Sequence, residues 1–325
     1  MKNNLKLALG ASLSLSLALA ACGSDDSSSG GSEGGGSEEG GGLDGASVTV
    51  GSKDFDEQKI LGYIAVVALE NAGADVTDQI NTGGTDVTRS ALTGGEIDMY
   101  WEYNGTAWIS FFGETDPIPD RIEQYEAVRD RDLEENDLVW LEPANFNNTY
   151  GIAFPTEAAG DLGDPETISD LGTLIEEETD KATLCVENEF SARDDGLPGM
   201  EKAYGFEFPG DNVSVLDTAL VYTQADKRDP CNFGAVFTTD GRISGLDLTV
   251  LEDDKGFFPL YNPSPVFRKE VFDEYGDSLK EVFNPISEAL TDEEMIALNE
   301  EVSINLAQPE QVAEDWLTEQ GLIDG

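Results

Sequence analysis

The feature that most restricts how this chain folds is an abrupt change of composition after Cys22. Residues 23–42 consist entirely of Gly, Ser, Asp and Glu. Such a segment has no apolar side chains to bury, so it cannot offset the entropy that a chain loses on folding. We therefore expect a flexible acidic Gly/Ser linker over 22–45 and a folded body that begins at about Ala46.

The residues before this linker have the pattern of an export signal. Two lysines among the first six residues precede a run of apolar, small and hydroxyl-bearing residues over 7–21. The run has the length of a signal-peptide core and is shorter than the ~20 apolar residues of a membrane-spanning helix. It ends in Leu-Ala-Ala-Cys at 19–22, as in a bacterial lipobox. We predict a signal peptide over 1–21 and lipidation of Cys22, which would anchor the protein to the outer face of the cytoplasmic membrane. The alternative is an ordinary signal peptide followed by a chance cysteine.

The charge balance is strongly acidic, with 67 acidic and 18 basic residues and a formal net charge of -49. This charge would repel nucleic acid and anionic membrane surfaces. So many carboxylates repel one another at low ionic strength and are better tolerated where salt screens them. We therefore expect a salt-loving source organism; the alternative is an acidic exported protein without that adaptation.

Several classes of chemistry lack their usual residues in this chain. There is no histidine, which is the commonest general base and metal ligand, and there is no P-loop or GxSxG motif. The body's two cysteines, Cys185 and Cys231, have no CxxC spacing, and a disulfide between them is favoured in an exported protein. We expect no enzyme activity, cofactor or metal site, although paired carboxylates leave a hydrolase as an alternative.

Strand and helix patterns alternate along the body, which indicates an α/β fold. A strand is expected over 46–50, followed by a turn at 51–53. Further strands are expected at 97–101, 150–154, 182–186, 234–238 and 248–251, and helices at 58–72, 168–178, 198–204, 269–275, 281–289 and 293–305. A turn expected at 83–85 leads into another helix that runs through Leu92. The final helices have no strands between them, so we predict that they pack on a first lobe, 46–146 plus 257–325. Residues 147–256 would form a second lobe, with a ligand in the cleft between the two.

Four aromatic residues lie in polar, turn-like contexts: Tyr103, Tyr150, Phe237 and Tyr261. A quaternary ammonium donates no strong hydrogen bond, and a protein holds it with ring faces worth about 0.5 to 2 kcal/mol each. Rings at loop edges suit such a cation. The alternative for each ring is core packing.

Basic residues are scarce enough for their positions to carry information. Lys53 lies in the predicted turn after the first strand, and Arg193 precedes a Gly-Leu pair. Either could bind a ligand carboxylate, and arginine can do so in bidentate fashion. The alternative for each is a salt bridge to one of the many acidic residues.

Several segments of the body together resemble the glycine betaine/carnitine/choline-binding proteins of osmoprotectant ABC importers. They are GSKDFDEQ at 51–58, ILG at 60–62, GGEID at 94–98, EYNGT at 102–106, TDGRI at 239–243 and DKGFFP at 254–259. The resemblance implies a two-lobed periplasmic-binding-protein-like fold of type II with its ligand in the inter-lobe cleft. It also implies a quaternary-amine ligand, and permease and ATPase subunits as partners.

The resemblance implies a set of ligand contacts as well. The cage for the ammonium group would be Tyr103, Tyr150, Phe237 and Tyr261, and contacts to a carboxylate would come from Lys53, Thr106 and Arg193. Many relatives have Tyr where this chain has Phe237, which keeps the ring face and loses a hydroxyl. Thr106 can donate to a carboxylate where an acidic residue would repel it, which favours a betaine-type zwitterion over choline.

Together these observations predict an extracytoplasmic solute-binding lipoprotein of an ABC importer that binds glycine betaine or a related quaternary-ammonium osmoprotectant. One alternative is a binder of another small cationic or zwitterionic solute, such as a polyamine or an amino acid. An extracellular hydrolase and a purely structural lipoprotein are the alternatives from other functional classes.

Overall fold

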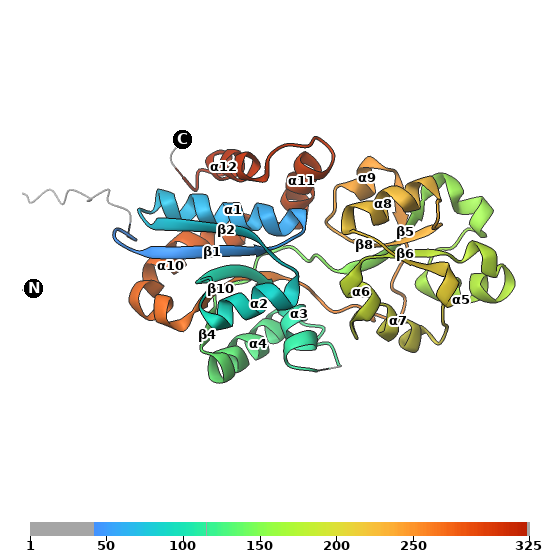
Figure 1. Cartoon of the computed structure of the whole chain (residues 1–325), viewed down its shortest axis with the longest axis horizontal. Coiled ribbons are helices and arrows are strands. Elements are labelled where there is room, and N and C mark those ends of the chain that lie inside the picture. The colour runs from blue at the N-terminus through green and yellow to red at the C-terminus, as the bar shows by residue number, and fades with distance from the viewer. Residues whose placement is uncertain (1–41, 115, 324–325) are drawn as a thin grey trace, which may run out of the picture. The chain divides into compact units, whose positions relative to one another are not determined.

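The computed structural model describes residues 42–114 and 116–323, which belong to one compact unit, Gly40–Gly325. The predicted signal peptide, Cys22 and nearly all of the predicted linker lie outside the described residues. Within the described part of the chain, no helix combines the length and apolar character needed to cross a membrane. The described elements form two five-stranded sheets, each with helices on both faces (Figure 1).

The first sheet has the strand order β2-β1-β3-β10-β4. Strand β1 is parallel to β2 and β3, whereas β10 runs antiparallel to β3 and β4. Its strands are β1 (Ser47–Lys53), β2 (Asp75–Gly83), β3 (Met99–Tyr103), β4 (Leu138–Trp140) and β10 (Pro263–Arg268). Its helices are α1 (Asp56–Asn71), α2 (Thr85–Gly94), α3 (Asn104–Thr106), a π-helix (Ala107–Phe111), α4 (Arg121–Asn136), α10 (Lys269–Ala289), α11 (Asp292–Ser303) and α12 (Pro309–Glu319).

Alternation along β3 shows how this sheet has two buried faces. Met99 and Trp101 pack into a core that includes residues of α1, α10, α11 and α12. Tyr100 points to the opposite face and packs with residues of α2 and α4. Successive side chains of a strand point to opposite faces, so a strand covered on both sides, like β3, is buried at every position.

The second sheet has the order β7-β6-β8-β5-β9. Its strands are β5 (Tyr150–Pro155), β6 (Leu184–Val186), β7 (Val213–Val215), β8 (Phe233–Phe237) and β9 (Leu248–Val250). Buried residues of α5 (Ile168–Glu177), α6 (Asn188–Ala192) and α7 (Leu197–Tyr204) form the core on one face, and those of α8 (Thr218–Lys227) the core on the other. The remaining helices are α9 (Arg242–Gly245) and three 3-10 turns, Thr156–Leu162, Thr179–Lys181 and Gly210–Asn212. The two mixed sheets confirm the predicted α/β class.

A disulfide joins Cys185 of β6 to Cys231, just before β8. The two Cα atoms are 5.5 Å apart, and both residues are fully buried. They pack with Val221 and Tyr222 of α8. The bond therefore lies in the core between α8 and the second sheet.

Two connecting segments, 141–149 and 251–262, carry the chain from one sheet to the other and back. They are hydrogen-bonded to each other: the backbone N–H of Asn148 donates to the carbonyl of Tyr261 at 3.2 Å, and the backbone N–H of Tyr261 donates to Oδ1 of Asn147 at 2.7 Å. Thr149 also donates its hydroxyl to the carbonyl of Pro259 at 2.9 Å. The two sheets are therefore joined by two hydrogen-bonded segments, 141–149 and 251–262, which we call the paired crossing.

Two local predictions are wrong. The turn expected at 51–53 belongs to β1, because Gly51 and Lys53 remain paired with Gln79 and Gly83 of β2 across a register irregularity. The helices expected at 269–275 and 281–289 are one helix, α10, which continues through Gly276. Apolar side chains on both sides of this glycine pack on the same core, and this packing favours a continuous helix.

Candidate ligand-binding site

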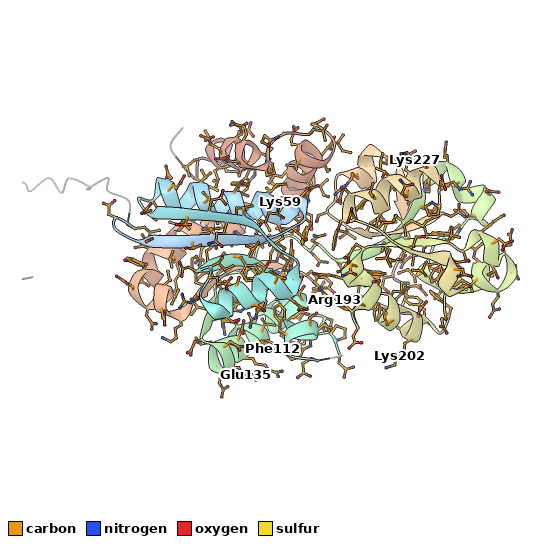
Figure 2. The ribbon with its side chains drawn as sticks, viewed as in Figure 1. Lys59, Phe112, Glu135, Arg193, Lys202 and Lys227 are labelled. Atoms are coloured by element: carbon orange, nitrogen blue, oxygen red, sulfur yellow. A yellow bond between two sulfur atoms is a disulfide. The ribbon has the colours of Figure 1, made fainter. Side chains whose placement is uncertain are left out.

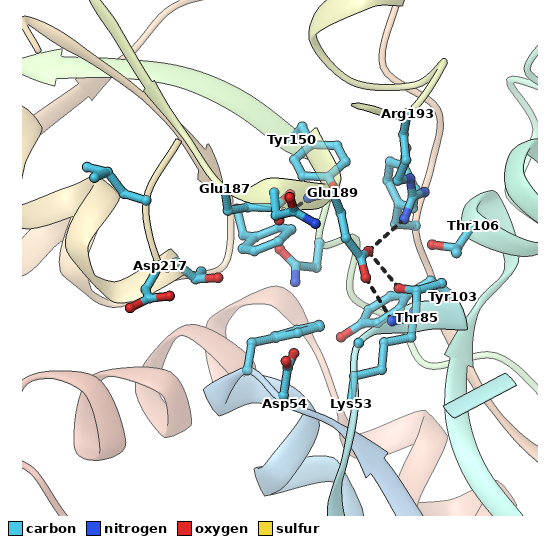
Figure 3. Close-up of a pocket in the computed structure, with 18 residues that line it drawn as sticks. Lys53, Asp54, Thr85, Tyr103, Thr106, Tyr150, Glu187, Glu189, Arg193 and Asp217 are labelled. Atoms are coloured by element: carbon cyan, nitrogen blue, oxygen red, sulfur yellow. Dashed lines mark hydrogen bonds and ion pairs between the residues drawn. The ribbon is translucent and has the colours of Figure 1, made fainter. Parts of the chain in front are cut away.

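A pocket of about 350 Å³ lies where elements of the two sheets meet (Figure 3). Strands β1, β3 and β8 end at it with Lys53, Tyr103 and Phe237, and β5 begins at it with Tyr150. Open α/β sheets commonly bind ligands beyond the carboxyl ends of their strands, where loops leave room. The strand ends of both sheets thus place their side chains around one cavity.

All seven predicted ligand contacts line this pocket: Lys53, Tyr103, Thr106, Tyr150, Arg193, Phe237 and Tyr261. In Figure 2, Arg193 lies where the elements around the first sheet meet those around the second. Lys202 and Lys227, by contrast, lie on outer surfaces of the elements around the second sheet. The fold therefore brings together residues that are far apart in the sequence. Their contacts with a ligand stay a prediction.

The aromatic rings of the pocket contact one another. The ring centroid of Tyr150 is 5.1 Å from that of Phe237 and 5.6 Å from that of Tyr261. Phe55, which the sequence analysis did not select, stacks on Phe237 at 5.3 Å and lies 6.2 Å from Tyr103. The cluster therefore has five rings, each with a face of negative electrostatic potential that attracts a cation.

Two of the tyrosines are held in place through their hydroxyl groups. Tyr103 donates to Oε1 of Glu57 at 2.7 Å, and Tyr261 donates to Oδ2 of Asp195 at 2.6 Å. Burial raises the pKa of both phenols well above the ordinary value. Both hydroxyls therefore stay protonated as donors, and the bonds fix the directions of the two rings.

Glu57, in the first turn of α1, joins several elements through its carboxylate. One oxygen accepts bonds from Tyr103 and from Nδ2 of Asn148 at 2.8 Å. The other accepts from the hydroxyl of Thr239 at 2.5 Å and from Nδ2 of Asn299 at 2.8 Å. These donors lie in β3, a connecting segment, the loop after β8 and α11. Glu57 therefore links Tyr103 of the pocket to Asn148 of the paired crossing between the sheets.

Lys53 carries an internal ion pair in addition to its place in the pocket. Its Nζ lies 2.7 Å from Oε1 of Glu102, and both side chains are buried. The same nitrogen lies 5.2 Å from the ring centre of Tyr103. Glu102 also accepts bonds from the hydroxyl of Tyr100 at 2.6 Å and from the backbone N–H of Tyr103 at 2.7 Å. The salt bridge considered as an alternative for Lys53 is therefore present.

Arg193 is paired in a similar way. Its guanidinium donates to both carboxylate oxygens of Asp195, from Nε at 2.7 Å and from Nη2, and Nη1 donates to Glu189 at 3.2 Å. Asp195 in turn accepts the hydroxyl of Tyr261. The salt bridge considered as an alternative for Arg193 is therefore also present, and it positions one of the rings.

Two further acidic residues of the pocket come from the start of α6. Glu189 accepts bonds from the backbone N–H and the hydroxyl of Thr85 in α2, both at 2.7 Å. Burial alone would raise the pKa of Glu189, but the charge of Lys53 and the bonds from Thr85 hold it below the ordinary value. Burial raises the pKa of Glu187 to about 7, although backbone bonds from Phe190 and Glu189 lower it.

Sequence reasoning missed Phe55, Glu187, Glu189 and Thr85 as pocket residues. Phe55 could have been found, since it lies between two aspartates and meets the same criterion of polar context as the four selected rings. Glu187 and Glu189 carried no distinguishing signal among 67 acidic residues. Their place in the pocket follows from the fold alone.

Comparisons with known proteins agree with this geometry. Residues 46–319 match the family model described as the substrate binding domain of ABC-type glycine betaine transport systems. A glycine-betaine-binding protein of Pseudomonas aeruginosa is 39% identical over 284 residues, which cover 86% of this chain and 89% of that protein.

Solved structures are similar over nearly the same span. The apo structure of YehZ, the Escherichia coli glycine betaine-binding protein, is 34% identical and aligns with a TM-score of 0.62 over 85% of this chain and 99% of YehZ. The structure of a glycine betaine/carnitine/choline ABC transporter protein aligns with a TM-score of 0.68 at 28% identity, over 85% of this chain and 100% of that one. The fold is thus the predicted two-lobed binding-protein fold, and the chain belongs to the family of substrate-binding domains of ABC-type glycine betaine transport systems.

Proposed function

We propose that this protein captures glycine betaine or a related quaternary-ammonium osmoprotectant outside the cell and delivers it to the permease and ATPase subunits of an ABC importer. The observation that carries the proposal is the gathering of five aromatic rings around one pocket. A quaternary ammonium lacks N–H groups, so ring faces are its natural partners, at about 0.5 to 2 kcal/mol each. The family is one of solute-binding proteins, and the ligand is released unchanged.

The carboxylate of a betaine would meet Lys53, Thr106 and Arg193. Both cations already hold internal ion pairs, but lysine has three N–H donors and arginine five. The bond to Glu102 accounts for one donor of Lys53. Each cation can therefore donate to a ligand carboxylate while it keeps its internal partner, and the hydroxyl of Thr106 can donate as well.

The two sheets would act as closing lobes, 46–146 plus 257–325 and 147–256. The paired crossing of 141–149 and 251–262 supports this division, since few residues connect the two sheets. Hinge motions use a few residues between rigid elements. A ligand held between the lobes would then stabilise the closed form.

A second candidate ligand has primary ammonium groups, as in a polyamine or an amino acid. Four acidic residues, Asp54, Glu187, Glu189 and Asp217, line the pocket and could accept N–H bonds. Such a ligand would depend on these carboxylates more than on the rings.

Thermal unfolding with a panel of solutes separates these candidates. A ligand at 100 times its Kd adds about 2.7 kcal/mol to the free energy of unfolding, which raises Tm. We expect glycine betaine, carnitine or choline to raise Tm, and putrescine, ectoine and proline to leave it unchanged. A rise with putrescine alone would favour the second candidate, and no rise with any quaternary amine would contradict the proposal.

The proposal includes a lipid anchor at Cys22 after cleavage of the signal peptide 1–21. The supporting observation is the Leu-Ala-Ala-Cys sequence that precedes the Gly/Ser/Asp/Glu segment. In a bacterial host, the wild-type protein should sediment with membranes, and Cys22→Ser should release it into the soluble fraction. Equal release of both proteins would contradict the anchor.

The source organism is proposed to be salt-loving, from the formal net charge of -49. Salt at 1 M shortens the Debye length to about 3 Å and so screens repulsion among surface carboxylates. Tm should therefore rise between 0.1 and 2 M NaCl. A flat or falling Tm over this range would contradict the adaptation to salt.

A further inference from the structure

We propose that Glu187 is a specificity-determining residue that accepts a hydrogen bond from an O–H or N–H group of the ligand. The pocket would then prefer quaternary amines that carry such a donor over glycine betaine, which has none. The inference rests on the proposed function, because it assumes that the rings hold a quaternary ammonium. It adds the requirement that the ligand carries a hydrogen-bond donor as well as the quaternary ammonium.

The position of the Glu187 carboxylate is fixed by the backbone. Glu187 lines the pocket between β6 and α6. One of its oxygens accepts from the backbone N–H of Glu189 at 2.6 Å, and the other accepts from the backbone N–H of Phe190. The carboxylate is therefore held in one orientation at the cavity wall.

This carboxylate keeps acceptor capacity for a ligand. An ionised carboxylate has about four acceptor sites, and one backbone N–H occupies each oxygen. Within residues 42–114 and 116–323, no side chain donates a hydrogen bond to Glu187 or forms an ion pair with it. A ligand O–H or N–H could therefore occupy an acceptor site that the backbone leaves open, and a hydrogen bond to a charged acceptor is stronger than one to a neutral acceptor.

The two cations of the pocket already have acidic partners other than Glu187. Lys53 is paired with Glu102, and Arg193 with Asp195 and Glu189. Glu187 is thus not required as the counter-ion of either base. Its charge is left to act on the ligand.

Glycine betaine is poorly matched to such a group. Its ammonium nitrogen bears only methyl groups, and its remaining polar atoms are carboxylate oxygens, which Glu187 would repel. Choline and carnitine have the same trimethylammonium group and add a hydroxyl donor. A cavity of about 350 Å³ lies within the range of about 300 to 1,000 Å³ that accommodates ligands larger than glycine betaine.

The ionisation of Glu187 gives the preference a pH dependence. Burial, helped by the nearby charge of Glu189, raises its pKa to about 7, although the backbone bonds from Phe190 and Glu189 and the charge of Arg193 lower it. Tyr150 faces the same cavity as a neutral phenol, and Asp54 and Asp217 line the pocket as exposed acids. Above pH 7 the carboxylate is mostly ionised and is the stronger acceptor. The preference for a donor should therefore grow from pH 6 to pH 8.5.

Matched pairs of ligands test the proposal on the whole folded body. Choline is compared with propyltrimethylammonium, in which a methyl replaces the hydroxyl, and carnitine with γ-butyrobetaine, which lacks the hydroxyl. A hydrogen bond to a charged group predicts roughly tenfold or greater preference for the donor in at least one pair at pH 8.5. Glu187→Gln should reduce this preference to less than about threefold and should strengthen binding of glycine betaine.

Asp211→Asn is the matched control, because it removes one exposed acidic charge outside the pocket. It should leave the ratio within each pair unchanged. If Glu187→Gln fails to fold, the pH dependence of the wild-type ratio tests the same point. Equal binding within both pairs, or a ratio that neither Glu187→Gln nor pH alters, would overturn the role of Glu187 and leave the proposed function intact. Failure of every quaternary amine to bind would overturn both.

Discussion

The carboxylate of Glu189 accepts two hydrogen bonds from Thr85, one from the backbone N–H and one from the hydroxyl, both at 2.7 Å (Figure 3). Glu189 belongs to α6 beside the second sheet, and Thr85 begins α2 beside the first. The bonds therefore bridge the two sides of the pocket. A negative charge at the start of a helix is also favourable for the helix dipole.

Loss of the Thr85 hydroxyl should weaken ligand binding. Thr85→Val keeps the backbone bond and the side-chain shape, but removes a bond to a charged acceptor worth about 1.5 to 3 kcal/mol. If the two lobes close on the ligand as proposed, this bond would contribute to the closed form, and affinity for the ligand should fall roughly tenfold. Thr93→Val, near the other end of α2 and outside the pocket lining, is the control for calorimetric titration. Equal affinity of the Thr85 and Thr93 variants would rule out a closing role for the bond.

Phe55 should contribute to binding although no prediction from the sequence included it. Phe55→Leu keeps an apolar side chain and removes a ring face, which should cost about 0.5 to 2 kcal/mol, or roughly 2- to 30-fold in Kd. Phe272→Leu on α10 is the control, because it also replaces a partly buried phenylalanine but lies outside the pocket. An unchanged Kd for Phe55→Leu in fluorescence titration would show that this ring is only packing.

Glu57 should contribute to stability as the acceptor of four hydrogen bonds. Glu57→Gln replaces one acceptor oxygen by an amide nitrogen, which would face donors and leave buried groups without partners. Such groups cost about 1 to 3 kcal/mol. Urea unfolding should show this loss, whereas Glu70→Gln, at the exposed end of the same helix, should change stability by less than about 0.5 kcal/mol. Similar stability of both variants would refute the role of Glu57 as a structural link.

Reduction of the disulfide should destabilise the second sheet and its helices. Cys185 and Cys231 are separated by 46 residues in the sequence, and a loop of this length predicts about 4 kcal/mol from chain entropy. The double substitution Cys185→Ala/Cys231→Ala should therefore lower Tm, and a reducing agent should lower the Tm of the wild type but not of the variant. A wild-type Tm that is insensitive to reduction would contradict this expectation.

The sequence predicted elements whose apolar pattern is strong and missed those whose pattern is weak. The segments 150–154 and 234–238 are apolar except for Thr238, and they lie largely within β5 and β8. Strand β2, by contrast, is polar and mostly exposed at the edge of its sheet, and α4 is dominated by charged residues. Strand β10 contains Pro263 and Pro265, which argue against a strand. These elements depend on contacts with neighbours that lie far away in the sequence.

The residues of the candidate site also differ in whether the sequence could predict them. The polar sequence contexts of four rings allowed their selection from the sequence, and all four line the pocket: Tyr103, Tyr150, Phe237 and Tyr261. The ion-pair partners of Lys53 and Arg193 could not be selected, because any of many carboxylates was available. Only the fold determines which acids face the cavity.

The rings are proposed to hold a positive charge and to do more than enclose an apolar group. The most direct measurement is calorimetric titration with pairs that differ only in that charge: choline against 3,3-dimethylbutan-1-ol, and glycine betaine against 3,3-dimethylbutanoate. Titration in 1 M NaCl limits long-range attraction by the acidic surface. With five rings at about 0.5 to 2 kcal/mol each, the charged member of at least one pair should bind roughly 50-fold tighter or more. Equal affinities within both pairs would contradict the account.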